Sequence, residues 1–255
     1  MTENTLTGRH AIITGAASGI GAATATRLAG AGARLTVADI NQEKLESFAE
    51  QLRGTGAEVE SWPIDLSDTA ALAGLSLDAD ILVNNAGIQH VAPLHEFPVE
   101  KWQLIQQLML TAPFLLIRAV LPAMYDRGWG RIVNISSAHG LRASEFKGAY
   151  VSAKHGLEGL SKVTALEGAP HGVTSVCINP GYVRTPIIEA QLKDQARTHG
   201  IPESEVLEKI LLAKQPLKRL AEASEIAEAV AFACSDAATS MTGSNIVLDG
   251  GWTAG

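Results

Sequence analysis

Cysteine, aromatic residues and charged residues are all scarce in this sequence. Cys177 and Cys234 are the two cysteines among 255 residues, and both lie in apolar segments without the spacing of a metal or redox motif. We therefore expect two buried free thiols in a reducing compartment. Aromatic residues make up 5% and charged residues 18%, whereas 46% of the residues are hydrophobic. This composition argues against disorder and predicts a substantial core.

Positive charge is scarce too. The chain has 20 Lys and Arg against 27 Asp and Glu, for a formal net charge of −7, and its cations are scattered. A nucleic-acid-binding protein needs a cationic face, so we expect no nucleic-acid partner. The histidines show no ligand spacing with cysteines or carboxylates, and no metal site is expected.

The sequence predicts neither a signal peptide nor a membrane-spanning segment. The first fifteen residues contain Glu3 and lack a cationic start before an apolar run, unlike a signal peptide. The most apolar stretch, 108–124, is broken by Pro113, Arg118 and Pro122, which predicts that it is too short and interrupted to span a bilayer. We expect no membrane partner and a cytoplasmic location.

What the sequence does contain is an alternation of short β-branched runs with longer helical patterns. The predicted strands are 10–14, 34–39, 57–65, 80–85, 131–136, 173–180 and 244–251. The predicted helices are 20–31, 41–53, 98–124 with a discontinuity at Pro113, 149–167 and 222–235. Because parallel strands need long crossovers, the pattern predicts an α/β fold: a doubly wound (Rossmann) parallel sheet of about seven strands in one domain, 1–255.

The segment 184–220 interrupts this alternation. It is polar and helical in pattern, and Pro186, Pro202 and Pro216 punctuate it. An insertion after the sixth strand lies at the carboxyl edge of the sheet, where ligands bind in such folds. We interpret it as a helical substrate lid; the alternative is a passive or interface-forming helical pair.

A glycine-rich loop joins the first strand to the first helix. Its sequence, TGAASGIG (14–21), allows a tight turn and lets backbone N–H groups approach a pyrophosphate at the positive helix end. No G-K-[ST] sequence follows these glycines, which excludes a P-loop NTPase. The predicted cofactor contacts in this loop are Thr14, Gly15, Ser18, Gly19, Ile20 and Gly21.

An acidic residue follows the second strand. Asp39 could accept both hydroxyls of an adenosine ribose and would repel a 2′-phosphate, which favours NAD over NADP. The alternative is a helix cap formed by Asp39 or Asn41. Asp65, at the end of the third strand, is placed to meet the adenine edge, although a turn-forming role fits it nearly as well.

A tyrosine, a lysine and a serine form the predicted chemical centre. Tyr150 and Lys154 are four residues apart on a predicted helix and so share a face. Ser136 and Ser137 end the fifth strand at the ligand edge. The Lys154 ammonium and an oxidised nicotinamide would both lower the pKa of Tyr150, making it a base for an alcohol proton while a serine hydroxyl orients the reacting oxygen.

Taken together, TGAASGIG, NNAG (84–87), the Ser–Tyr–Lys set and INPGYVRTP (178–186) resemble the short-chain dehydrogenase/reductase family over almost the full chain. The resemblance implies catalytic roles for Ser137, Tyr150 and Lys154, with Tyr150 and Lys154 also contacting the cofactor NAD. It further implies cofactor contacts by Asp65, Leu66, Asn85, Ala86, Gly87, Pro180, Gly181, Val183 and Thr185.

Stretches outside the cofactor motif are similar to one group within that family, the bacterial 3-hydroxybutyrate dehydrogenases. These stretches are 84–102, 136–156 and 249–255. The resemblance implies NAD-dependent interconversion of (R)-3-hydroxybutyrate and acetoacetate, a pocket for a small hydroxy acid, and a homotetramer. The implied substrate-binding residues are Gln89, Ser137, His139, Lys147, Tyr150 and Gln191, with Trp252 closing the pocket from the same or a neighbouring subunit.

One position departs from the family pattern. The family has Asn seven residues after the Trp of the long helix, where it holds a helix irregularity and a water that links the Lys to solvent; Trp102 places Met109 there. Met forms no strong hydrogen bond, so proton release is in question. Two alternatives follow: a related enzyme for another small hydroxy acid or alcohol, and an NAD-binding sensor with little turnover.

Overall fold

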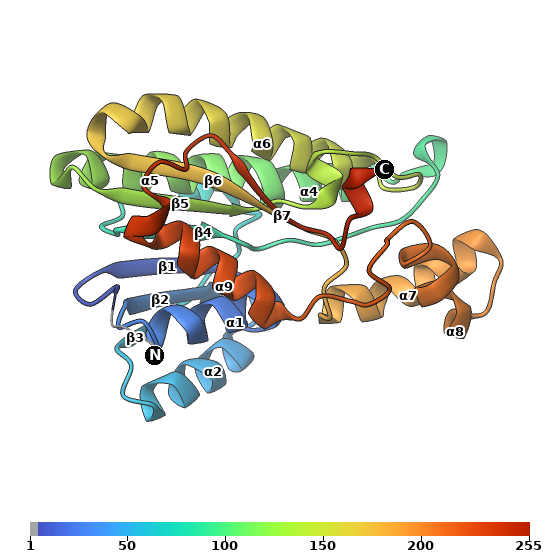
Figure 1. Cartoon of the computed structure of the whole chain (residues 1–255), viewed down its shortest axis with the longest axis horizontal. Helices are drawn as coiled ribbons and strands as arrows, with labels where there is room; N and C mark the ends of the chain where they lie inside the picture. The colour runs from blue at the N-terminus through green and yellow to red at the C-terminus, as the bar shows by residue number, and fades with distance from the viewer. Residues whose placement is uncertain (1–4) are drawn as a thin grey trace.

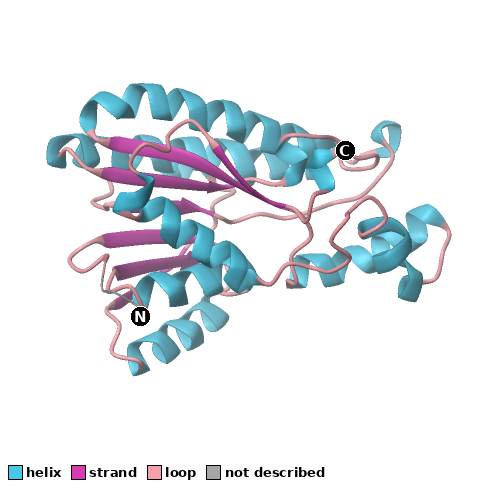
Figure 2. Cartoon of the chain, in the orientation of Figure 1, coloured by secondary structure: helices cyan, strands magenta, loops and turns pink. Residues whose placement is uncertain are grey.

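The computed structural model describes residues 5–255, apart from the side chains of residues 187 and 189–191. Seven parallel strands form one sheet in the order β3-β2-β1-β4-β5-β6-β7 (Figures 1 and 2). The strands are β1 (His10–Thr14), β2 (Arg34–Asp39), β3 (Val59–Pro63), β4 (Ile81–Asn84), β5 (Gly130–Ile135), β6 (Val173–Pro180) and β7 (Asn245–Leu248). The order reverses between β1 and β4, which confirms the doubly wound fold expected from the alternating pattern.

Helices cover both faces of this sheet (Figure 1). The first face carries α1 (Gly19–Ala29), α2 (Gln42–Gly54) and α9 (Ala223–Cys234), and the second carries α4 (Val99–Gln106), α5 (Ala112–Arg127) and α6 (Gly148–Gly168). A short helix that the sequence pattern did not predict, α3 (Thr69–Leu72), packs against α5. Its N-cap is Asp68, whose carboxylate accepts a hydrogen bond from the Ala71 N–H.

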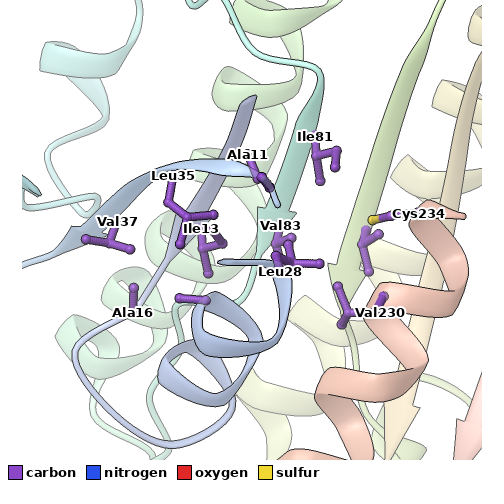
Figure 3. Close-up of a cluster of buried hydrophobic side chains, with 14 of the residues drawn as sticks. Ala11, Ile13, Ala16, Leu28, Leu35, Val37, Ile81, Val83, Val230 and Cys234 are labelled. Carbon is purple, nitrogen blue, oxygen red and sulfur yellow. The ribbon is translucent and has the colours of Figure 1, made fainter. Parts of the chain in front are cut away.

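The core lies in two layers because successive strand residues point to opposite faces. Ile13 and Val83 face α1 and α9, where they pack with Leu28 and Val230 (Figure 3). Their strand neighbours face α5 instead: Ile12, Leu82 and Ile132 pack with Leu116, Val120 and Met124. Burial on both faces explains the continuous apolar runs of the inner strands.

The long helix contains its irregularity slightly earlier than expected. Between α4 and α5 lies η2 (Gln107–Thr111), a single π-helical turn that ends just before Pro113. Proline has no N–H to donate to the preceding turn, so the wider turn lies where a regular helical hydrogen bond would be lost. The discontinuity that we predicted at Pro113 therefore lies in the preceding turn, Gln107–Thr111.

The merged helix Val99–Arg127 is longer than the sequence pattern suggested. It is long and apolar enough to cross a membrane by length and composition alone, and half of its most apolar window is buried inside the protein. Leu116, Val120 and Met124 form part of the core beneath the sheet. This burial is that of a core helix, so its apolar content is explained by packing.

The segment after β6 forms a separate helical layer at the carboxyl edge. It contains α7 (Pro186–His199), α8 (Glu203–Val206) and the π turn η5 (Leu207–Leu211). These helices have their own small apolar cluster, formed by Ile188, Val206, Leu211, Leu212 and Leu220. In Figure 1, α7 and α8 project away from the helices that flank the sheet.

Candidate active site

A cleft of about 230 Å³, partly open to solvent, lies at the carboxyl edge of the sheet. It is lined by residues that follow β1, β2, β4, β5 and β6 and by the first turns of α6. Because β1 and β4 are the strands at which the order reverses, the cleft occupies the place where this fold class binds ligands. Most of the predicted cofactor residues lie here: Gly15, Ser18, Gly19, Ile20, Asp39, Asn85, Ala86, Gly87, Tyr150, Lys154, Pro180, Gly181, Val183 and Thr185.

The turn from β1 into α1 requires glycine at three positions, Gly15 before the helix and Gly19 and Gly21 in its first turn. Gly15 and Gly19 have φ of +64° and +56°, a region that residues with a side chain rarely adopt. A Cβ on Gly21 would lie 2.1 Å from the Gly15 carbonyl oxygen. The chain therefore turns sharply and leaves the N-terminal N–H groups of α1 at the cleft. Such a cradle fits the pyrophosphate of a dinucleotide.

Thr14 and Gly21 belong to the structure of this loop rather than to the cleft lining. The Thr14 hydroxyl accepts hydrogen bonds from the N–H groups of Asn85 (2.9 Å) and Ala86 (3.0 Å). The Asn85 side-chain amide donates in return to the carbonyl oxygens of Thr14 (2.8 Å) and Gly15 (3.1 Å). These bonds fix the glycine loop to the end of β4.

Asp39 reaches the cleft at the end of β2. Its carboxylate accepts hydrogen bonds from the Ala17 N–H in the glycine loop (3.1 Å) and from the Asn41 N–H (2.9 Å). The competing interpretation, a cap of α2, applies to Asn41, whose side chain accepts from the Lys44 N–H at 3.0 Å. Asp39 is thus left facing the space beside the glycine loop.

Asp65 and Leu66 do not line the cleft. The Asp65 carboxylate is exposed and accepts hydrogen bonds from the N–H (2.9 Å) and hydroxyl (2.6 Å) of Ser67, which is the turn-forming alternative. Leu66 is 5% exposed and packs in the core on the α5 side. Their predicted cofactor contacts stay predictions.

The serine, tyrosine and lysine converge at the floor of the cleft. Ser137 follows β5, while Tyr150 and Lys154 lie one turn apart on α6. The Lys154 ammonium donates to the Ile135 carbonyl oxygen at 2.6 Å and lies 5.6 Å from the centre of the Tyr150 ring. Two elements distant in the sequence thus bring together a hydroxyl, a phenol and a cation.

Burial controls the acid–base properties of these groups. It lowers the pKa of Lys154 to about 8, against the opposing influence of Cys177 and Glu158. Burial also raises the pKa of Tyr150, while a hydrogen bond with Ser137 lowers it. In the protein without cofactor, desolvation has the largest influence on the pKa of Tyr150. The predicted lowering by Lys154 together with a bound oxidised nicotinamide stays a prediction for the cofactor complex.

A second polar group forms the inner end of the cleft, where Gln89, His139 and Lys147 lie. Burial, followed by Lys147, lowers the pKa of His139 to about 3, so its imidazole is neutral at physiological pH. Its Nε2 lies 2.9 Å from Ser144 Oγ and its Nδ1 3.5 Å from Ser137 Oγ. The sequence pattern did not identify Ser144, because a serine in a polar loop carries no distinctive signal.

Lys147 is the cation of this inner end. Its side chain is 3% exposed, and burial lowers its pKa to about 8. The Nζ lies 5.1 Å from the centre of the Tyr182 ring, and no salt bridge to Lys147 occurs among the residues that the structure describes. A buried ammonium without a carboxylate partner is costly unless a ligand supplies the anion.

Two further predictions concern the rim. Trp252 lies beside His139 of the same chain, with ring centres 5.1 Å apart, so this chain's own tryptophan contacts a residue of the pocket without lining the cleft itself. Gln191 lies on α7, but its side chain falls outside the described residues. In the described part of the chain, no cluster of three metal-ligating side chains occurs.

Met109 also faces the cleft. It lies in the π turn η2, is 1% exposed and packs with Ile105, Ala149 and Ala153. The helix irregularity that the family's Asn was expected to hold is therefore formed here with Met in that place. The irregular backbone is retained, and only the side-chain amide is absent.

Comparison with known proteins agrees with this geometry. Residues 9–196 match the family model for short chain dehydrogenases. The chain is 43% identical to D-beta-hydroxybutyrate dehydrogenase of Rhizobium meliloti (strain 1021), covering 96% of this chain and 99% of the relative. It is 40% identical to D-beta-hydroxybutyrate dehydrogenase of Cupriavidus necator, covering 98% and 99%.

A solved structure from Beutenbergia cavernae superimposes with a TM-score of 0.86 at 33% identity, over 99% of both chains; it is assigned to an NAD(P)-dependent gluconate 5-dehydrogenase and contains NADP at low occupancy. The family match, the relatives and the cleft all point the same way. The chain belongs to the short-chain dehydrogenase family and is an oxidoreductase that uses a nicotinamide cofactor.

Proposed function

We propose that the protein interconverts (R)-3-hydroxybutyrate and acetoacetate with NAD as its cofactor. The observation that carries the proposal is Lys147, a buried cation that forms no salt bridge with the carboxylates the structure describes, in a cleft that neutral His139 and Gln89 also line. One cation, one imidazole and one amide suit a small carboxylate. The names of the two similar dehydrogenases support the same substrate.

The residues of the cleft suggest how the reaction proceeds. Bound NAD supplies the hydride acceptor. Tyr150 takes the proton of the substrate hydroxyl, Ser137 hydrogen-bonds its oxygen, and Lys154 binds the nicotinamide ribose while its charge favours the phenolate. The glycine loop would hold the pyrophosphate, and Asp39 would accept hydrogen bonds from the hydroxyls of the adenosine ribose. We further propose that the segment 184–220 is the substrate lid and that the enzyme is a cytoplasmic homotetramer.

The direct test is to follow NADH absorbance with each candidate substrate. We expect turnover of (R)-3-hydroxybutyrate and poor turnover of 2-butanol, which has the same secondary alcohol without the carboxylate. Equal turnover of both would contradict the carboxylate pocket and favour the neutral-alcohol alternative. Binding of NADH without turnover of any hydroxy acid would favour a sensor instead.

Lys147 should make substrate binding depend on pH. Because burial lowers its pKa to about 8, the ammonium is present below that pH and is lost above it. The KM for acetoacetate should therefore rise as the pH increases through about 8. A charge-assisted hydrogen bond is worth about 1.5–3 kcal/mol, so Lys147→Met should raise KM roughly 10- to 100-fold and remove the pH dependence.

The matched control is Lys147→Arg, which keeps the charge at every accessible pH. Its KM should no longer rise above pH 8, whatever its value at neutral pH. Lys154 has a pKa in the same range, but its titration would change kcat and cofactor binding. A KM that is independent of pH in the unmodified protein would exclude Lys147 as the carboxylate partner.

Met109 should slow proton release without abolishing catalysis. The missing side-chain amide removes one hydrogen bond from the path between Lys154 and solvent, worth about 1–3 kcal/mol, or roughly ten- to a hundredfold in rate. Met109→Asn should raise kcat, most clearly at low pH where proton release is hardest, and leave NAD affinity unchanged. A pH–rate profile of both proteins measures this; an inactive parent rescued by Met109→Asn would identify a disabled enzyme.

A further inference from the structure

Phe146 has an unusual backbone conformation. Among the described residues it is the one non-glycine residue with positive φ, at +66°. Side chains with a Cβ are disfavoured in this region, and a bulky aromatic residue there is a genuine outlier. The strain persists only if the surrounding contacts hold the residue in place.

Phe146 lies in the segment between Ser144 and Lys147, beside the inner end of the cleft. Two residues before it, the Ser144 hydroxyl contacts His139 Nε2 at 2.9 Å. The next residue is the buried Lys147. The Phe146 carbonyl oxygen accepts a hydrogen bond at 3.0 Å from the N–H of Ala92, in the loop that also carries Gln89. The conformation of Phe146 thus fixes the short segment that holds Lys147 in the cleft lining and Ser144 against His139.

The ring of Phe146 points elsewhere, to the helical layer. It meets the ring of His199 edge to face, with centres 5.6 Å apart and an interplanar angle of 82°. His199 is the last residue of α7. Because α7 and α8 have a separate apolar cluster and project from the sheet (Figure 1), this aromatic contact joins the far end of α7 to the body of the protein.

We propose that Phe146 is a positioning residue. Its ring holds the C-terminal end of α7 through the contact with His199, and its strained backbone connects this contact to Lys147. A turn with φ of +66° alone would favour glycine, which has the same freedom without strain. The benefit of a phenylalanine at this position is therefore the contact of its ring with His199. This contact connects the position of α7 with the geometry of the inner pocket. The consequence for substrate binding rests on the proposed function.

The first experiment needs no substrate. Trypsin can cleave α7 at the exposed residues Lys193 and Arg197 when the helix opens locally. An edge-to-face aromatic pair is worth about a two- to tenfold population shift, so Phe146→Gly should speed cleavage at these sites by about that factor. Phe146→Tyr, which keeps the ring, should be cleaved at the parent rate, and His199→Ala should behave like Phe146→Gly.

The second measurement separates positioning from general destabilisation. Phe146→Gly removes the strain together with the ring, so Tm should stay within about 2 °C of the parent. In Phe146→Gly, the KM for the hydroxy acid should rise about three- to tenfold, with kcat and the KM for NAD nearly unchanged. Phe146→Tyr should have the KM of the parent protein.

Two results would overturn the proposal: cleavage of Phe146→Gly at the parent rate, or equal increases in both KM values. A failure of the proposed substrate would show as absent turnover in the parent protein. The cleavage result would still decide whether Phe146 holds the end of α7.

Discussion

Replacing Tyr150 with phenylalanine should lower kcat for 3-hydroxybutyrate oxidation by about 10²- to 10⁴-fold, the usual contribution of a general base. The variant keeps the ring, which packs edge to face with His139 at 6.1 Å, and loses only the hydroxyl. Cofactor affinity should therefore change little. Rates with saturating NAD and titration of NADH fluorescence measure the two quantities.

Tyr182 provides the matched control. It lines the same cleft, and burial together with Tyr150 raises its pKa to about 12. The hydrogen bond with Ser137 that lowers the pKa of Tyr150 is not among the influences on Tyr182, so Tyr182 is the poorer base. Tyr182→Phe should retain kcat within a few-fold. A loss of activity in Tyr182→Phe as large as in Tyr150→Phe would contradict the assignment of the base.

The pH dependence of the parent follows from the direction of the Tyr150 shift. Because burial raises the pKa of Tyr150, the phenolate becomes more abundant as the pH rises, and kcat for oxidation at saturating substrate should increase with pH below about 8, where Lys154 is still protonated. Tyr150→Phe should lose this dependence. A profile that is flat in the parent would show that Tyr150 does not supply the base.

Asp39 should make the enzyme prefer NAD over NADP by about 100-fold in kcat/KM. A 2′-phosphate would bring a second anion against a carboxylate that already faces the glycine loop, at a cost of a few kcal/mol. Asp39→Ala should narrow the ratio by removing the repulsion. The measurement is kcat/KM with each cofactor for both proteins.

Asp65→Ala is the control for this prediction. Asp65 is an exposed carboxylate of the same charge whose side chain does not line the cleft, so its removal should leave the ratio unchanged. The related structure with bound NADP makes the comparison necessary. Equal use of NAD and NADP by the unmodified protein would refute the role of Asp39.

Much of the framework follows from local pattern. The β-branched run at Val173–Pro180 was predicted with the bounds that the structure has, because a strand buried on both faces is a continuous apolar segment. The edges of the sheet were less predictable. The third strand is Val59–Pro63 instead of 57–65, since an edge strand ends where its single neighbour does. The four-residue helix α3 has too few residues for a periodic signal.

Within the site, spacing identified the residues that one element presents together. Tyr150 and Lys154 are a turn apart on α6, and Gly15, Gly19 and Gly21 lie within seven residues in the turn from β1 into α1, so local geometry was sufficient. Residues contributed by separate loops were harder to place. Ser144 beside His139 and the contact of Phe146 with His199 depend on how distant segments meet.

The sequence by itself determined the parallel α/β fold, the glycine loop and the Ser–Tyr–Lys set, because each depends on residue type and short-range spacing. Only the tertiary structure decided that the Asp65 carboxylate accepts hydrogen bonds from Ser67, that the π turn forms with Met109, and that burial raises the pKa of Tyr150. Those outcomes depend on which groups surround a residue in space. Desolvation in particular has no counterpart in the linear chain, since it is set by all the atoms that exclude water from a side chain.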